Sequence, residues 1–102
     1  MKTVNIIKKK HFLVADIILL RSDVNYTHIF FKNGKQLTVA KTLKEMEPKF
    51  IKVGFFRTHK SYLVNPNHIL DYYDVDSELL LSRNLKANVS RRRKEAFEKT
   101  LP

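Results

Sequence analysis

Short segments with a period of two dominate this sequence and point to a mainly β fold. Residues that favour strands cluster between brief turn signals, and only two glycines and three prolines interrupt the 102 residues. The pair Asn33-Gly34 predicts a hairpin turn of type I′, because both residues tolerate a positive φ. Strands are expected at 12–20, 26–32, 37–39, 54–57, 62–64, 69–73, 79–81 and 87–89.

Two short helices are expected beside the strands. Residues 42–45, Thr-Leu-Lys-Glu, have the form of a capping box, in which the Thr hydroxyl and the Glu carboxylate satisfy free amides at a helix start. Pro48 is expected to stop this helix after about one to two turns. Ser90 is placed to cap a second helix near the C-terminus. Its apolar face is expected to consist of Ala96, Phe97 and Leu101.

The composition predicts one small domain over residues 1–102. Hydrophobic residues make up 43% of the chain, enough for a modest core. The chain has no cysteine, which excludes a disulfide framework and a thiolate zinc site. It also lacks the long apolar run of a signal peptide or membrane span, so we expect a cytoplasmic protein without membrane contact. The core candidates are Phe55, Val64, Ile69, Leu79, Leu81 and Phe97.

Charge is abundant and unevenly distributed. The formal net charge is +10. Six basic residues lie between Arg83 and Lys94, and four acidic ones lie between Asp71 and Glu78, so we expect a basic and an acidic side. A dense cluster of like charges repels itself, which a bound anion would compensate; a solvated helix face is the simpler alternative. Because Lys and Arg gain affinity by neutralising phosphates, nucleic acid is the expected partner.

An enzyme is not expected. The four histidines, His11, His28, His59 and His68, have no metal-ligand spacing, and no glycine-rich loop precedes a helix. Ser61 and His59 have neither a partner acid nor the setting of a nucleophile elbow. We therefore predict no cofactor, no metal and no small-molecule substrate.

Residues 55–65, Phe-Phe-Arg-Thr-His-Lys-Ser-Tyr-Leu-Val-Asn, place polar groups suited to a charged partner beside apolar positions. This run resembles the core signature of the LytTR family of bacterial DNA-binding domains, roughly F-x-R-x-H-x-S-x-x-V-N followed by an Ile. Residues 25–29 resemble the first contact loop of that family, and residues 88–92 resemble its V-S-R segment. The resemblance runs from about Phe12 to Phe97. The signature positions are filled by Phe55, Arg57, His59, Ser61, Val64, Asn65 and Ile69.

The resemblance implies an elongated antiparallel β-sheet arrangement with one short internal helix and a short C-terminal helix. It also implies that loops, rather than a recognition helix, enter the major grooves. Many members follow the receiver domain of a two-component response regulator, whereas this match begins soon after Met1, as in a stand-alone regulator or a separated domain. Carried over by position, the DNA-binding residues are Asn25, Tyr26, Thr27 and His28 in the first loop, Arg57, His59, Lys60 and Ser61 in the second, and Ser90, Arg91 and Arg92 in the third.

Side-chain chemistry predicts different roles within this set. Arg91 can donate two hydrogen bonds to guanine O6 and N7, so it is the best candidate for reading a base. Lys60 can read guanine singly or hold a phosphate. Phosphate contacts are expected from Ser61, Arg92 and Arg57.

Three further polar residues have a structural alternative. Asn25 can read adenine or simply form a turn. His59 can face DNA or be hydrogen-bonded inside the fold. Asn65, next to Pro66, is expected to be structural because its amide can satisfy local backbone groups.

The favoured hypothesis is a bacterial transcription regulator that binds duplex DNA specifically. Two copies are expected to bind repeated half-sites, and a homodimer on DNA is one arrangement that they can take. The alternative is a small β-barrel that binds single-stranded nucleic acid. The bases of the single strand would stack on Tyr26, Phe31 or Tyr72. A module of a different class would use residues 91–94 to dock on acidic protein or lipid.

Overall fold

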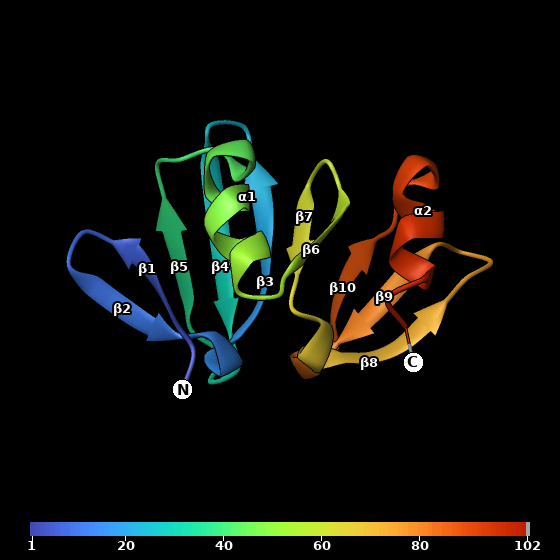
Figure 1. Cartoon of the computed structure of the whole chain (residues 1–102), viewed down its shortest axis with the longest axis horizontal. Coiled ribbons are helices and arrows are strands. Elements are labelled where there is room, and N and C mark those ends of the chain that lie inside the picture. Colours follow the sequence, from blue (N-terminus) through green and yellow to red (C-terminus); the bar gives the residue numbers. More distant parts are fainter. Residues whose placement is uncertain (102) are drawn as a thin grey trace.

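Within residues 1–101, which the computed structural model describes, ten strands form three antiparallel sheets that follow one another along an elongated molecule (Figure 1). Its extents are 40 × 27 × 23 Å. The predicted mainly β, elongated class is therefore confirmed. The first sheet consists of β1 (Thr3–Ile7) and β2 (Lys10–Leu13). The central sheet has the order β5 (Gln36–Val39), β4 (Tyr26–Phe31), β3 (Ile17–Asp23), β7 (Tyr62–Val64) and β6 (Phe56–His59). The third sheet has the order β10 (Leu85–Asn88), β9 (Glu78–Leu81) and β8 (Ile69–Tyr73).

The helical elements are short. The two α-helices are α1 (Leu43–Lys52), which follows β5, and α2 (Arg91–Glu98), which follows β10. Three 3₁₀ turns lie between strands: η1 (Val14–Asp16), η2 (Pro66–His68) and η3 (Ser82–Asn84). The predicted helix caps are present, since the Thr42 hydroxyl accepts from the Glu45 amide at 3.2 Å and the Ser90 hydroxyl accepts from the Arg93 amide at 3.3 Å.

The central sheet is covered on both faces, because neighbouring residues of a strand point to opposite sides. Phe31 packs into one core cluster with Met46 and Phe50 of α1. Phe30 packs against a second cluster, which contains Phe97 of α2 and residues of the third sheet. Of the predicted core residues, Ile69 is partly buried and the others are buried: Phe55, Val64, Leu79, Leu81 and Phe97.

The strand predicted at 12–20 is wrong, because η1 divides it and an unpredicted strand, β1, pairs with its first part. The carbonyls of Val14 and Ile17, at the two ends of η1, accept from the buried Asn65 amide at 3.2 and 2.9 Å. Asn65 lies far along the chain from these carbonyls, and its hydrogen bonds stabilise the break between β2 and β3. The short N-terminal strand has no strong local signal, and its hairpin turns at Lys9, which has a φ of 64°.

The helix predicted to stop at Pro48 is longer than expected. Pro48 lies inside α1, which continues to Lys52. Proline removes one backbone donor from the helix, but Met46 and Phe50 on either side of it are both 0% exposed. Their burial in the first cluster stabilises the helix beyond the proline, while Pro48 itself is exposed.

Two smaller expectations also need correction. The hairpin at Asn33-Gly34 is present as the turn between β4 and β5, but it is not of type I′: Gly34 has a positive φ of 91°, and Asn33 does not have a positive φ. Asn33 instead accepts from the Lys35 amide with its side-chain oxygen at 2.9 Å. In α2, Ala96 is exposed and Phe97 packs in the second cluster; Leu101 packs against the same cluster but lies after the end of α2.

Candidate nucleic-acid interface

The three predicted contact segments lie along one edge of the molecule, the upper edge in Figure 1. These are the β3–β4 turn, the β6–β7 turn and the start of α2. Pairing of β3 with β7 joins the first two, and the Ser22 amide donates to the Ser61 carbonyl at 2.9 Å. The Ser90 amide donates to the Thr58 carbonyl at 2.7 Å, which joins the third segment to the second. Backbone hydrogen bonds therefore fix the spacing of the three segments.

The tip of the first segment is open to solvent. Asn25 is exposed and Tyr26 is 51% exposed. Val24 beside them is 85% exposed and has a φ of 53°, a conformation that is unfavourable for a β-branched residue. Strand pairing of Asp23 with Tyr26 leaves only two residues for the turn. The exposed side chains thus project from a tight, sharply bent connection.

The other two residues of the first segment are engaged within the fold. Thr27 is 0% exposed, and its hydroxyl donates to the Lys41 carbonyl at 2.7 Å. The His28 ring is half-buried, with Nε2 at 2.9 Å from the Asp23 carboxylate and Nδ1 at 2.7 Å from the Thr38 hydroxyl. Thr27 and His28 therefore hold the β3–β4 turn against its neighbours.

Arg57 holds the second segment through hydrogen bonds to the backbone of the β6–β7 turn. Its Nε donates to the His59 carbonyl at 2.8 Å and its Nη2 to the Lys60 carbonyl at 2.5 Å. Its Nη1 forms an ion pair with Glu47 of α1, and the side chain is only 13% exposed. One guanidinium thus spans the β6–β7 turn and ties it to α1. Its hydrogen bonds lie inside the protein, although the sequence predicted a phosphate contact.

His59 and Lys60 form the outer part of the same turn. The His59 Nδ1 accepts from the Ser61 amide at 3.1 Å, so the neutral ring carries its proton on Nε2. Lys60 is exposed at the tip and Ser61 is half-buried. Partial burial lowers the pKa of His59, and the positive charges of Lys60, Arg93 and Arg57 lower it further.

This pKa shift predicts a pH-dependent contribution of His59 to stability. The folded-state pKa of His59 lies below the unfolded-state value of 6.5. The contribution of His59 to stability is therefore complete at pH values above 6.5, and it is lost as the pH falls through the folded-state pKa. The wild type should lose more free energy of unfolding than His59→Gln between about pH 7.5 and about pH 5. Urea unfolding at both pH values measures this, with His11→Gln in β2 as the control. Equal losses in wild type and His59→Gln would contradict the assignment.

The third segment combines a helix start with a dense positive charge. Arg91 and Arg92 are exposed in the first turn of α2, and Arg93 is half-buried behind them. An open hollow of about 290 Å³ joins this segment to the second one. It is lined by His59, Lys60, Ser90, Arg92 and Arg93.

Arg93 is the residue of this site that the sequence analysis missed. It was counted within the basic run and within the docking alternative, but it was not among the residues predicted to contact DNA. Its position three residues after the Ser90 cap was the available signal, because residues at that spacing lie on the same side of a helix.

The hollow lacks balancing negative charge. Partial burial lowers the pKa of Arg93, and so do the positive charges of Arg57 and Arg92. The negative charge of Glu47 raises it. Glu47 is already paired with Arg57. The N-terminus of α2 adds the positive end of a helix dipole. The edge is therefore suited to bind an extended anion.

No helix within residues 1–101 is long and apolar enough to cross a membrane. No group of three or more His, Asp or Glu side chains there is arranged to hold a metal ion.

Comparisons with known proteins agree with the geometry. The family model of the LytTr DNA-binding domain matches residues 8–102. Among solved structures, the chain is similar to the LytTr DNA-binding domain of a Bacillus cereus protein described as a methyl-accepting/DNA response regulator. The TM-score is 0.72 at 25% identity, over 96% of this chain and 93% of that one. Comparison with curated protein sequences gives no match. The chain belongs to the LytTR family, a family of DNA-binding domains rather than of enzymes.

Proposed function

We propose that this domain binds duplex DNA sequence-specifically and serves as the output domain of a bacterial transcriptional regulator. The observation that carries this proposal is the single edge on which three segments present exposed polar side chains. Within residues 1–101 these side chains make no hydrogen bond or ion pair with the rest of the protein. They belong to Asn25, Tyr26, Lys60, Arg91 and Arg92.

The roles we assign divide the site into residues that touch DNA and residues that hold the loops. Arg91 reads guanine through its two-pronged donor, and Lys60 reads guanine or holds a phosphate. Ser61, Arg92 and Arg93 bind phosphates around the hollow. The loops are held in place by Thr27, His28, Arg57 and Ser90, whose side chains are engaged within the protein.

The three loops would enter successive stretches of major groove, and the elongated shape favours this mode. We further propose that two copies bind repeated half-sites, as the resemblance to the family implies. A regulator of this kind acts where the chromosome lies, so the cytoplasm is its proposed location.

The single-strand alternative receives less support. Of the three proposed stacking platforms, Phe31 is 9% exposed and lies in the core. The Tyr72 ring packs edge-on against Phe97, and its hydroxyl donates to Glu98 at 2.7 Å. Of these three platforms only Tyr26 is an exposed ring, and a single ring is a poor track for successive bases.

The testing experiment is selection from random duplex DNA by the purified protein at near-physiological salt. The selected duplex is then compared with a scrambled duplex and with its separate strands. A short enriched motif bound more tightly than either control supports the proposal. Binding of single strands as tightly as the duplex, without an enriched motif, would overturn it.

Arg91→Ala and Arg92→Ala should have different effects on this DNA. Arg91→Ala should cost about 1–3 kcal/mol on the selected duplex and relax the preference at one base pair. Arg92→Ala should weaken selected and scrambled duplexes alike and reduce the salt slope by about one unit. Affinity titrations at several salt concentrations measure both effects.

Lys99→Ala is the matched control for these variants. It removes one positive charge from the other end of α2, where the only ion-pair partner of Lys99 within residues 1–101 is the exposed Glu95, at 3.5 Å. If Arg91→Ala lost affinity equally on selected and scrambled DNA, its assignment to base reading would be wrong.

A further inference from the structure

Val24 is an exposed apolar side chain on the edge that carries the three contact segments. It is 85% exposed in the two-residue turn between Asp23 and Tyr26, and it belongs to neither core cluster. A single exposed apolar residue is common on protein surfaces and by itself indicates no function. Val24 differs from such a residue in its backbone conformation.

The backbone of Val24 is in the left-handed region, with a φ of 53°, whereas Asn25 after it does not have a positive φ. When only the first central residue of a two-residue hairpin turn has a positive φ, glycine normally occupies that position. Within residues 1–101, Val24 is the only β-branched residue with a positive φ. Its exposed side chain gains no burial that would offset the unfavourable conformation. Residues held in such conformations concentrate at functional sites.

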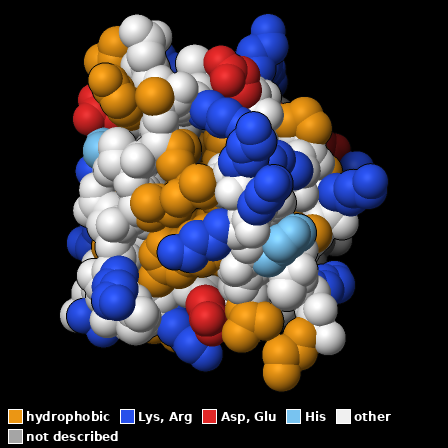
Figure 2. Space-filling view, turned by 90° about the vertical axis from the view of Figure 1, so that its left-hand side faces the viewer, with side chains coloured by type: hydrophobic (Ala, Val, Ile, Leu, Met, Phe, Trp, Pro, Cys, Tyr) orange, Lys and Arg blue, Asp and Glu red, His pale blue; other side chains and the backbone are white. Residues whose placement is uncertain are grey.

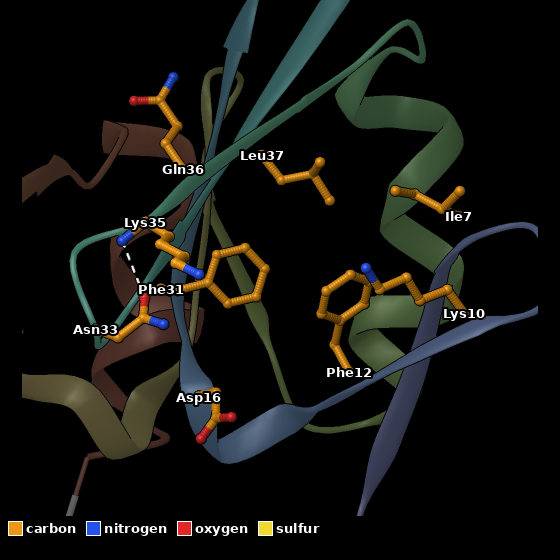
Figure 3. A pocket seen from close by; sticks show the side chains of 9 residues that line it. All are labelled: Ile7, Lys10, Phe12, Asp16, Phe31, Asn33, Lys35, Gln36 and Leu37. Carbon is orange, nitrogen blue, oxygen red and sulfur yellow. Dashed lines mark hydrogen bonds between the residues drawn. The ribbon is translucent and has the colours of Figure 1, made fainter.

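Packing accounts for the apolar surface at the β1–β2 end of the molecule, which Figure 2 shows among Lys and Arg side chains. In the hollow of about 350 Å³ beside this hairpin, the rings of Phe12 and Phe31 lie 5.4 Å apart (Figure 3). Phe31 belongs to the first core cluster, and Phe12 packs against it. The apolar surface there is therefore the border of a core. Val24 has no comparable explanation.

The turn that carries Val24 is fixed in place before any ligand binds. The Asp23 carboxylate lies 2.9 Å from Nε2 of His28, and the Ser22 amide donates to the Ser61 carbonyl at 2.9 Å. A preformed turn loses little conformational freedom when it binds a partner.

The chemistry of the tip is complementary to an A·T base pair. In the major groove, thymine presents a C5-methyl group, which apolar side chains contact. The amide of an asparagine can bind adenine N6 and N7. The turn presents one exposed side chain of each kind, in the adjacent residues Val24 and Asn25.

We propose that Val24 contacts the C5-methyl group of a thymine and thereby helps to set the sequence preference of the first segment. This rests on the proposed function, because the turn meets a thymine methyl group only when it enters the major groove of a duplex. In the DNA complex Val24 gains an apolar contact that the fold itself does not provide.

The test replaces each thymine of the selected duplex, one at a time, with deoxyuridine, which lacks only the C5-methyl group. The wild type should bind at least one of these duplexes about fourfold more weakly, the factor that corresponds to burial of one methyl group. Val24→Ala removes both γ-methyl groups, so it should bind that duplex and the thymine duplex with equal affinity. Its salt dependence should equal that of the wild type, because no charge is altered.

Val75→Ala is the matched control. Val75 is 94% exposed at the β8–β9 turn, between Asp74 and Asp76, and it does not have a positive φ. Phosphates are repelled by these two carboxylates, so Val75 should not contact DNA. Val75→Ala should therefore keep the fourfold difference between the thymine and deoxyuridine duplexes that we expect of the wild type, about 0.8 kcal/mol.

Val24→Gly tests the argument from backbone conformation. Glycine adopts a positive φ without a steric clash, so this variant should unfold at a higher urea concentration than the wild type. It should also lose the preference for thymine over deoxyuridine. A gain in stability together with a loss of specificity is expected where an unfavourable conformation serves function. An unfolding midpoint below that of the wild type would contradict the argument.

The outcomes separate this inference from the proposed function. Failure of the wild type to enrich any duplex motif would refute the proposed function itself. If a motif is selected and bound tightly but no deoxyuridine substitution weakens binding of the wild type, the thymine contact is refuted. The contact is also refuted if Val24→Ala loses as much affinity as the wild type on the same substituted duplex.

Discussion

Replacing Asn65 with alanine is expected to lower the free energy of unfolding by about 3–4 kcal/mol, because buried polar groups would lose their partners. Asn65 is 2% exposed. Its amide nitrogen donates to the carbonyls of Val14 and Ile17, and its oxygen accepts from the Asn67 amide at 3.1 Å. The side chain thus connects η1, β3 and η2. Alanine would leave three backbone groups without this partner.

Urea unfolding of the variants measures this loss. Asn65→Asp keeps an acceptor for Asn67 but loses both donors and adds a buried charge, so it should also be strongly destabilised. Asn67→Ala is the matched control, because the exposed Asn67 uses only its backbone amide here. A loss for Asn65→Ala no larger than that for Asn67→Ala would show that the amide contacts contribute little. The structural role predicted for Asn65 from sequence agrees with these contacts.

Arg57→Ala is expected to cost about 2–3 kcal/mol of stability, less than a fully buried ion pair because Glu47 can rehydrate. The variant should also weaken binding to every duplex, because the β6–β7 turn loses the guanidinium that spans it. The carbonyls of His59 and Lys60 would have no replacement donor within the turn. Urea unfolding and DNA titrations of the same preparations measure the two effects.

Arg57→Lys distinguishes a positioning role from a phosphate contact. Lysine keeps the charge, but its single ammonium cannot reproduce the guanidinium fork that binds two carbonyls and Glu47. If Arg57 positions the loop, Arg57→Lys should lose nearly as much affinity as Arg57→Ala. If lysine restores the affinity and the salt dependence of the wild type, Arg57 instead contacts phosphate. Glu47→Gln should reproduce part of the stability loss, because it weakens the ion pair without altering the charge of the loop.

Local signals made much of the fold predictable. The β4–β5 hairpin, strand β8 and the Ser90 cap each follow from a few adjacent residues, although the turn type of the hairpin does not. The break at η1 was not predictable, because the Asn65 amide that stabilises it is about 50 residues away. The extension of α1 past Pro48 likewise depends on a core that local sequence does not describe.

The candidate site was predictable as segments rather than as individual roles. The family resemblance pointed to three segments as contacts, which stays a prediction, and the structure brings these segments to one edge. Thr27 and Arg57 look like contact residues in the sequence because they are polar and lie in the right segments. Their hydrogen bonds inside the protein depend on Lys41 and Glu47, which lie elsewhere in the chain.

The division between exposed residues and holding residues has a consequence for protein engineering. The side chains of Asn25, Lys60 and Arg91 are exposed and make no hydrogen bond or ion pair within residues 1–101. A library that randomises these positions, while Arg57 and Ser90 stay unchanged, should consist largely of folded proteins. New sequence preferences could then be selected in this scaffold at little cost in stability.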